Sequence, residues 1–198
     1  FLHSMIITFI QAKKLLLGIT DISLDLGLTK AKIEIQDDKF TFPDKQTLTK
    51  TDLKKVIKKS AMCFFIENNT IVQIAIFSQE TNTYYKLVPT VDWPTIELSG
   101  IRMHMTSKLT PKLDTEKKIS FIEPITGNVL DTCTGLGYTA IMASKSGDLV
   151  YTYERDSNVI EIQKVNPHSK ELFNNLKIKT HNEDIFEAIK ELKNNYFN

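Results

Sequence analysis

The chain lacks the long apolar runs, the cysteine content and the charge imbalance that mark specialised classes of protein. Its longest apolar runs, residues 15–17 and 62–66, are far shorter than the ~20 residues that a membrane-spanning helix needs. Its two cysteines, Cys63 and Cys133, have neither metal-ligand spacing nor a disulfide pattern, so we expect a reducing, cytoplasmic setting. The 25 Lys and Arg residues nearly balance the 24 Asp and Glu residues, and the net charge is +1. The chain therefore has no overall positive potential that would attract nucleic acid or a membrane surface. No membrane or metal partner is therefore expected.

The length and composition are those of an ordinary folded protein. The 198 residues are 41% hydrophobic and 25% charged, which suffices to bury a core in one or two domains. Residues 1–4 precede Met5 and are interpreted as a remnant of cloning. We therefore expect the native chain to begin at Met5.

Residues 5–106 are predicted to form a small β-rich N-terminal domain with one or two helices. Apolar residues first recur at helical spacing and then alternate at the spacing of strands. Asn68 and Asn69, between two apolar runs, indicate a hairpin turn. The predicted elements are a helix over 6–17, a β-meander over 22–42, a helix over 53–59 capped at Thr51 and Asp52, and strands over 62–67, 71–78, 83–88 and 95–98.

Two functions are open for this N-terminal domain. It is expected to cover one end of the following sheet and to shape the entrance for a substrate. The alternative is a module that binds RNA, because Lys54, Lys55, Lys58 and Lys59 form a basic run. A basic run on a short helix is usually a solvated face, which favours the first interpretation.

The loop over residues 99–106 carries two substrate-side candidates, Arg102 and His104. Arg102 could hold a carboxylate or a phosphate through two hydrogen bonds, and His104 could exchange protons near neutral pH. The alternative is that Arg102 pairs with an acidic residue and that His104 is a satisfied surface residue. For His104 the alternative is favoured.

A β-run, a glycine turn and the start of a helix follow one another directly over residues 128–141. Glycines in such a turn permit positive φ and let the backbone approach a ligand closely. The acid that precedes the turn is expected to orient the loop or to meet an ammonium group. Cys133 is not expected to be a nucleophile, because no histidine is placed to activate it. The cofactor-binding candidates here are Asp131, Thr132, Cys133, Thr134, Gly135, Gly137 and Tyr138.

Residues 107–198 are predicted to form part of an α/β domain with a parallel sheet, because strands and helices alternate with short connections. Ligands of such sheets bind at the carboxyl ends of the strands. Asp131, Glu154 and Asp184 all fall at such ends. The predicted strands cover 128–131, 149–153 and 176–180, and the predicted helices cover 111–121, 138–145, 159–165 and 185–193.

The two later acids have the positions of nucleoside ligands. Glu154, at the end of the second strand, could accept hydrogen bonds from a ribose diol. Asp184 could accept a hydrogen bond from an adenine amino group while Ile185 packs on the ring, and Arg155 is a further cofactor-binding candidate. The alternative is that these carboxylates only cap helices, as Asp184 could do for the helix after it.

The acid, the glycine turn and the two later acids resemble the class I S-adenosylmethionine-dependent methyltransferases. The turn departs from a dinucleotide fingerprint because Cys133 occupies the first glycine position. The resemblance implies a Rossmann-like sheet with S-adenosyl-L-methionine as cofactor. In that family the first acid and the glycine loop face the amino acid part, the second acid binds the ribose and the third binds the adenine.

A closer resemblance is to an archaeal family of predicted methyltransferases often labelled spermidine-synthase-like. It implies a small N-terminal β domain fused to the methyltransferase sheet. The run over 130–141 is its most specific part. The similar segments are residues 22–28, 42–44, 99–104, 130–141 and 166–169, together with Glu154.

The family should continue past Asn198 with a fourth strand that lines the substrate pocket, followed by three more. The chain therefore resembles the N-terminal half of the sheet, with the C-terminal part either truncated or supplied by another polypeptide. We predict a second polypeptide that completes the sheet, since an unpaired Val129 edge exposes apolar surface. The leading function is a methyltransferase of unknown substrate. The alternatives are a spermidine-synthase-like aminopropyltransferase and a non-catalytic subunit that binds RNA or a partner.

Overall fold

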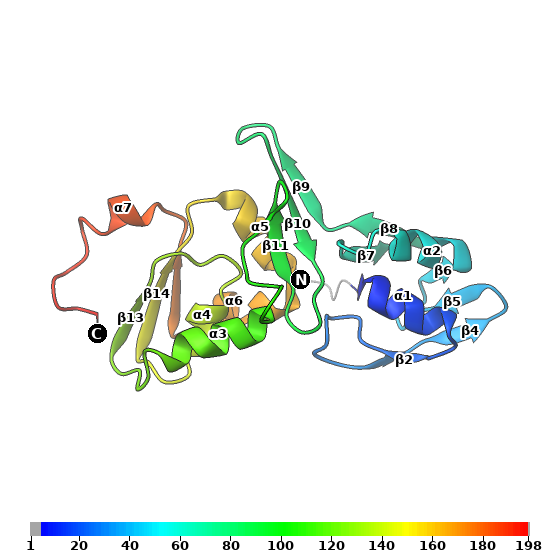
Figure 1. Ribbon diagram of the computed structural model, residues 1–198, viewed down its shortest axis with the longest axis horizontal. Coiled ribbons are helices and arrows are strands. Elements are labelled where there is room, and N and C mark those ends of the chain that lie inside the picture. Colours follow the sequence, from blue (N-terminus) through cyan, green and yellow to red (C-terminus); the bar gives the residue numbers. More distant parts are fainter. Residues whose placement is uncertain (1–4, 198) are drawn as a thin grey trace.

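The computed structural model describes residues 5–197 and has a mixed α/β architecture. Residues 1–4, interpreted as a remnant of cloning, lie outside the described part. The molecule is elongated, with short strands and two helices at one end, an antiparallel sheet in the middle and a parallel sheet with helices at the other end (Figure 1). None of the helices in the described part has the length and apolar character that crossing a membrane requires.

Two short helices organise the N-terminal part, and each begins with a capping box. Thr8 caps α1 with Gln11 at its third position, and Thr49 caps α2 with Asp52. The cap predicted at Thr51 is therefore wrong, because the helix begins earlier. The elements are β1 (Ile6–Ile7), α1 (Phe9–Leu16), β2 (Asp21–Ile22), β3 (Ala31–Lys32), β4 (Glu34–Gln36), β5 (Lys39–Thr41), β6 (Thr47–Thr49), α2 (Lys50–Lys58), β7 (Phe64–Glu67) and β8 (Thr70–Gln73).

The first part of the predicted β-meander is a turn, because only Ile22 of residues 22–26 lies in a strand. The Ser23 hydroxyl accepts a hydrogen bond from the Gly27 N–H at 2.7 Å. The Asp25 carboxylate accepts one from the Thr29 N–H at 2.9 Å. These bonds from backbone to side chain compete with strand pairing, so the alternation does not lead to a longer strand.

The hairpin predicted at Asn68 and Asn69 is confirmed, with φ +50 and +59 between β7 and β8. The apolar run that follows is divided at Ile74, whose N–H donates to the Cys63 carbonyl and whose carbonyl accepts from the Leu87 N–H. The chain thereby passes into the middle sheet, whose order is β12-β11-β10-β9. Its strands are β9 (Ala75–Ser78), β10 (Thr83–Val88), β11 (Thr95–Leu98) and β12 (Ile101–Arg102).

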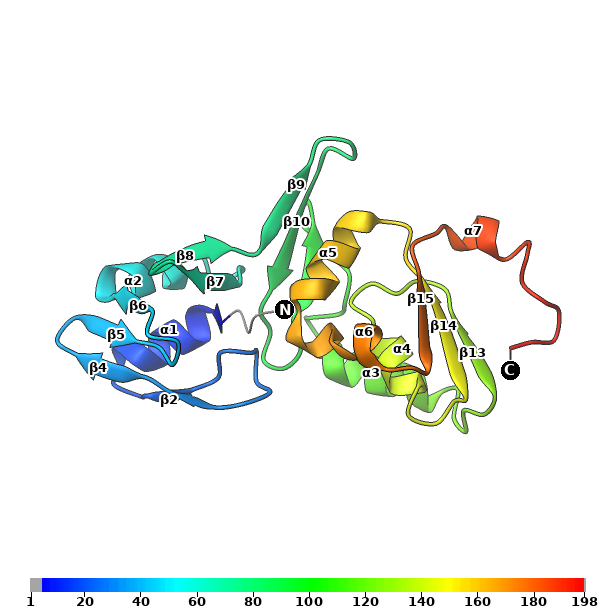
Figure 2. The same cartoon turned by 180° about the vertical axis from the view of Figure 1, so that it is seen from behind.

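The C-terminal part contains a sheet in the order β13-β14-β15, and its parallel strands confirm the predicted parallel sheet. Residues of α3, α4 and α6 share one buried cluster with β14 and β15, and Figure 2 shows these helices on one side of the strands. The elements are α3 (Pro111–Ser120), β13 (Asn128–Asp131), α4 (Tyr138–Ala143), β14 (Leu149–Tyr153), α5 (Ser157–Val165), the 3-10 helix η1 (Pro167–Ser169), α6 (Glu171–Asn174), β15 (Ile178–His181) and α7 (Ile185–Ala188).

The last helix is shorter than the one predicted over residues 185–193, since α7 ends at Ala188. Phe186 is 77% exposed and Ile189 is 53% exposed. Helices this short depend on tertiary packing, and little of it is available here.

Most buried apolar residues in the described range 5–197 fall into three clusters. One lies within the N-terminal part, and one lies between the parallel sheet and its helices. The third joins Tyr85 and Ile96 of the middle sheet to Tyr138 and Ile162 of the C-terminal part. The domain boundary at residue 106 stays a prediction, and this shared cluster shows that buried side chains pack across it.

Candidate functional site

The carboxyl ends of the three parallel strands lie side by side. Asp131 of β13 pairs in register with Thr152 of β14, and Tyr153 pairs with His181 of β15. Glu154 follows β14 directly, and its N–H donates to the His181 carbonyl at 2.9 Å. Asp131 and Glu154 therefore lie next to each other's strands at the carboxyl ends of β13 and β14.

Asp131 is tied into a network of threonine hydroxyls. Its carboxylate accepts hydrogen bonds from Thr139 of α4 at 3.0 Å and from Thr152 of β14 at 2.5 Å. Thr152 uses its one hydroxyl proton for Asp131, so its oxygen accepts a hydrogen bond from the Thr134 hydroxyl at 2.6 Å. Burial raises the pKa of Asp131, and the two threonine hydrogen bonds oppose that shift. This geometry supports the first predicted role of Asp131, which is to orient the glycine loop.

Glu154 holds the glycine loop from the neighbouring strand. One carboxylate oxygen accepts from the Gly135 N–H at 3.0 Å, and the other accepts from the Asp156 N–H at 2.9 Å. On the other side of the loop, the Gln163 side chain of α5 donates to the Gly135 carbonyl at 2.6 Å. The loop therefore has a defined conformation fixed by side chains of two later elements.

The two glycines of the loop serve different purposes. Gly135 has φ +53, and a Cβ built there meets no atom within 4 Å, so the space beside it is open. Gly137 has φ +80, and a Cβ there lies 2.3 Å from Cδ1 of Leu172. Gly135 thus offers room for a ligand, whereas Gly137 is required by the packing of α4 against α6.

The remaining loop residues divide into exposed and buried ones. Thr132 and Cys133 are exposed, and Thr134 is buried. The side chain of Tyr138 is 3% exposed, and its hydroxyl donates to the Pro94 carbonyl at 2.8 Å. The ring therefore belongs to the shared core, and the predicted cofactor contact of Tyr138 stays a prediction.

The third acid, Asp184, caps α7 by accepting from the Phe186 N–H at 2.9 Å. Its second oxygen pairs with the exposed Arg155 guanidinium at 3.5 Å. Ile185 is half-buried beside it. The capping role foreseen as an alternative is therefore present, and the predicted contact with an adenine stays a prediction.

Arg102 and His104 do not join the acids at the sheet edge. Arg102 pairs with Glu97 at 3.4 Å and donates to the Thr106 hydroxyl at 3.0 Å, which is the predicted alternative of an acidic partner. His104 is mostly buried, with Nδ1 2.9 Å from the Thr95 hydroxyl. Burial, followed by the charge of Lys118, lowers the pKa of His104 to about 4. The prediction that His104 exchanges protons near neutral pH is therefore wrong.

Sequence patterns missed the contacts that join the middle sheet to this site. The Tyr85 hydroxyl of β10 donates to the Asp156 carboxylate at 2.6 Å. Asn166 donates to the Tyr138 hydroxyl at 3.0 Å and to Ser169 at 2.8 Å. The polar run that includes Asn166 and Ser169 was a detectable signal, but nothing in the sequence identifies Tyr85 as a partner of Asp156.

Two cavities in the described part of the chain lie away from the acids. The larger, about 460 Å³, is bounded by α1, α2, β10 and β12. The smaller, about 190 Å³, lies beside α1 and the turn around Gly27.

The chain is similar in sequence to an uncharacterized protein of Methanocaldococcus jannaschii. The two are 41% identical over 181 residues, a match that covers 89% of this chain and 61% of that protein. The chain thus spans about three fifths of the length of this relative. No model of a protein family matches the chain.

Solved structures show weaker likenesses. Spermidine synthase from Thermotoga maritima has a TM-score of 0.49 at 22% identity, covering 65% of this chain and 49% of that chain. A tRNA methyltransferase of Methanocaldococcus jannaschii has a TM-score of 0.36 at 16% identity, covering 85% and 51%. Likenesses at these scores do not bear on what this chain does.

Proposed function

We propose that this chain provides the cofactor-binding part of an S-adenosylmethionine-dependent methyltransferase with a Rossmann-like sheet. The observation that carries the proposal is the hydrogen bond from the Gly135 N–H to the Glu154 carboxylate at the ends of β13 and β14. It joins a glycine loop to an acid on the next strand, where nucleoside ligands of parallel sheets bind.

The residues present fit such a cofactor. Each Glu154 oxygen accepts one backbone N–H, which leaves a lone pair on each for the two ribose hydroxyls. The open space beside Gly135 gives room for the amino acid part. Asp184 keeps acceptor capacity for an amino group of the base, with Ile185 beside it.

The cofactor would supply an electrophilic methyl group, and the residues of this chain would bind and orient it. Asp131 positions the loop through Thr139 and Thr152, so the loop needs little rearrangement on binding. In this proposal the methyl acceptor is activated by residues outside the described part of the chain.

Calorimetry with S-adenosylmethionine tests the proposal. Glu154→Ala should abolish measurable binding, because it removes the ribose acceptor and frees the Gly135 N–H. Asp148→Ala removes an exposed carboxylate at the opposite end of β14 and should leave binding unchanged. Thermal unfolding of both variants shows whether the fold is retained. Equal affinity of wild type and Glu154→Ala would contradict the assignment.

Decarboxylated S-adenosylmethionine separates the two enzyme hypotheses. Tighter binding of the decarboxylated form would favour aminopropyl transfer, as in spermidine synthases. Preference for the intact cofactor supports methyl transfer.

A second polypeptide that completes the sheet is part of the proposal. In residues 5–197, β13 pairs with β14 alone, so its outer edge is open. A partner strand added at this edge would pair the open backbone groups of β13.

Hydrogen exchange tests this pairing. The probe is the part of the Methanocaldococcus jannaschii relative that this chain does not match, added to the chain as a separate polypeptide. Slower exchange at Val129 and Leu130 supports edge pairing, and unchanged exchange with no complex formed contradicts it.

A further inference from the structure

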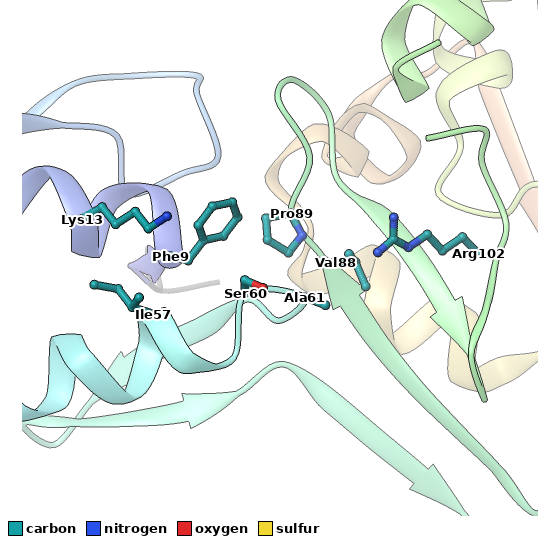
Figure 3. Close-up of a pocket in the computed structure, with 8 residues that line it drawn as sticks. All are labelled: Phe9, Lys13, Ile57, Ser60, Ala61, Val88, Pro89 and Arg102. Carbon is teal, nitrogen blue, oxygen red and sulfur yellow. The ribbon is translucent and has the colours of Figure 1, made fainter. Parts of the chain in front are cut away.

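The cavity of about 460 Å³ has the size and lining of a ligand site, and the proposed cofactor does not use it. It lies between the two N-terminal helices and the middle sheet, as Figure 3 shows. Its apolar surface comes from both sides, and its polar groups are two cations and one hydroxyl. The lining residues are Phe9, Lys13, Ile57, Ser60, Ala61, Val88, Pro89 and Arg102.

The two cations reach the cavity from opposite sides. Figure 3 shows Lys13 extending from α1 and Arg102 extending from β12, with the rings of Phe9 and Pro89 between them. The Lys13 ammonium lies 5.4 Å from the centre of the Phe9 ring. An anion bound at the Lys13 ammonium would therefore have an aromatic surface beside it.

The charge of this cavity is not neutralised by the acid next to it. Glu97 pairs with Arg102 at 3.4 Å, but it also pairs with Lys86 at 2.7 Å, so this triad keeps one positive charge. Arg102 uses one N–H for Glu97 and one for Thr106, which leaves further donors for a ligand. In the described part of the chain Lys13 has no ion pair.

The positive surface continues beyond the cavity. α1 and α2 pack side by side (Figure 1). The lysines of α2 are exposed. Among them, Lys55 pairs with Asp52, while Lys54 and Lys58 form no ion pair among the described residues. A ligand with several phosphates spaced along a chain matches this surface better than a single small anion does.

We propose that this cavity binds one nucleotide of a single-stranded nucleic acid. The base lies against Phe9 and Pro89, one phosphate lies at Lys13 and the next lies at Arg102, and further phosphates follow the lysines of α2. Stacking on an aromatic ring combined with cations along the backbone is how proteins hold single strands. Binding at this site does not require the cofactor, so it can be tested even if the proposed function fails.

Fluorescence anisotropy with a labelled oligouridylate of about ten nucleotides tests the site on the whole chain without cofactor. Lys13→Gln and Arg102→Gln should each weaken binding and reduce the slope of log affinity against log salt by about 0.7, the value for one lost single-strand phosphate contact. Phe9→Leu keeps an apolar side chain but removes the ring, and it should weaken binding about fivefold or more through lost stacking. Lys39→Gln on β5 removes the same charge outside the cavity and should change neither quantity.

Thermal unfolding of each variant confirms that it is folded. If the cavity variants bind like Lys39→Gln, or if wild type does not bind the oligonucleotide, the proposal is overturned. Uridine monophosphate identifies the source of the nucleotide. If it binds as tightly as the oligonucleotide, the cavity takes a free nucleotide and the assignment to a nucleic acid is wrong.

Discussion

Replacing Gly137 by alanine tests whether the second glycine of the loop is there for packing. The alanine Cβ would lie 2.3 Å from Cδ1 and 2.6 Å from Cγ of Leu172. Leu172 is 2% exposed and belongs to the cluster between the parallel sheet and its helices, so it cannot move aside freely. Gly135 provides the matched comparison, because it also has positive φ but has open space where an alanine Cβ would lie.

Both substitutions carry the cost of an L-residue at positive φ, and Gly137→Ala should destabilise the fold further because its Cβ overlaps Leu172. An L-residue in the left-handed region loses about 1 kcal/mol, which is all that Gly135→Ala should cost. Gly137→Ala adds an overpacking cost of about 1–3 kcal/mol, for a total of roughly 2–4 kcal/mol. In a chain of this size that corresponds to a fall in Tm of roughly 4–16 °C.

Urea unfolding followed by circular dichroism measures both changes. A double-mutant cycle with Leu172→Ala adds a second check, because removing the Leu172 methyls relieves the overlap. The double variant should then be more stable than the sum of the single effects predicts, by about 1 kcal/mol or more. The reasoning is refuted if Gly137→Ala costs no more than Gly135→Ala, or if the two single effects simply add.

Two further variants test the join between the middle sheet and the parallel sheet. Because the folded pKa of His104 is about 4 against an ordinary 6.5, the unfolded state binds more protons between these values and stability falls as pH falls. Between pH 7 and pH 4 the free energy of unfolding, measured with urea, should fall by about 3 kcal/mol. His104→Gln should reduce this dependence on pH. If the variant depends on pH as the wild type does, the assignment to His104 is wrong. Tyr85→Phe removes the hydrogen bond to the Asp156 carboxylate and should cost about 1–3 kcal/mol, measured in the same way, whereas a neutral effect would show that the contact contributes nothing.

The parallel sheet could be predicted from sequence because its signals are local. β13 and β14 have the predicted bounds, and short connections between strands and helices imply parallel pairing. The last helix was predicted too long, since its apolar spacing continues past Ala188 while the packing that would sustain it does not. Periodicity reports which residues could face a core, but tertiary contacts decide whether the helix forms.

The candidate site was predictable in part. The order of acids and glycines located Asp131, Gly135 and Glu154, which the structure brings together. The same order assigned Tyr138 to the cofactor, although its hydroxyl bonds to a carbonyl of the middle sheet. That contact joins residues far apart in the chain, so no local spacing could have revealed it.

The structure also changes the expected role of Glu154 in binding a ligand. From sequence it is a free carboxylate waiting for a ribose, yet both of its oxygens already hold backbone N–H groups. A ligand therefore meets a loop that is fixed before it arrives, and the entropy of ordering that loop is lost on folding instead of on binding. It follows that Glu154 should act on affinity in two ways, as a direct acceptor and as the residue that keeps Gly135 in place. Glu154→Gln can keep one backbone contact but offers fewer acceptor sites, so its affinity should fall between those of wild type and Glu154→Ala.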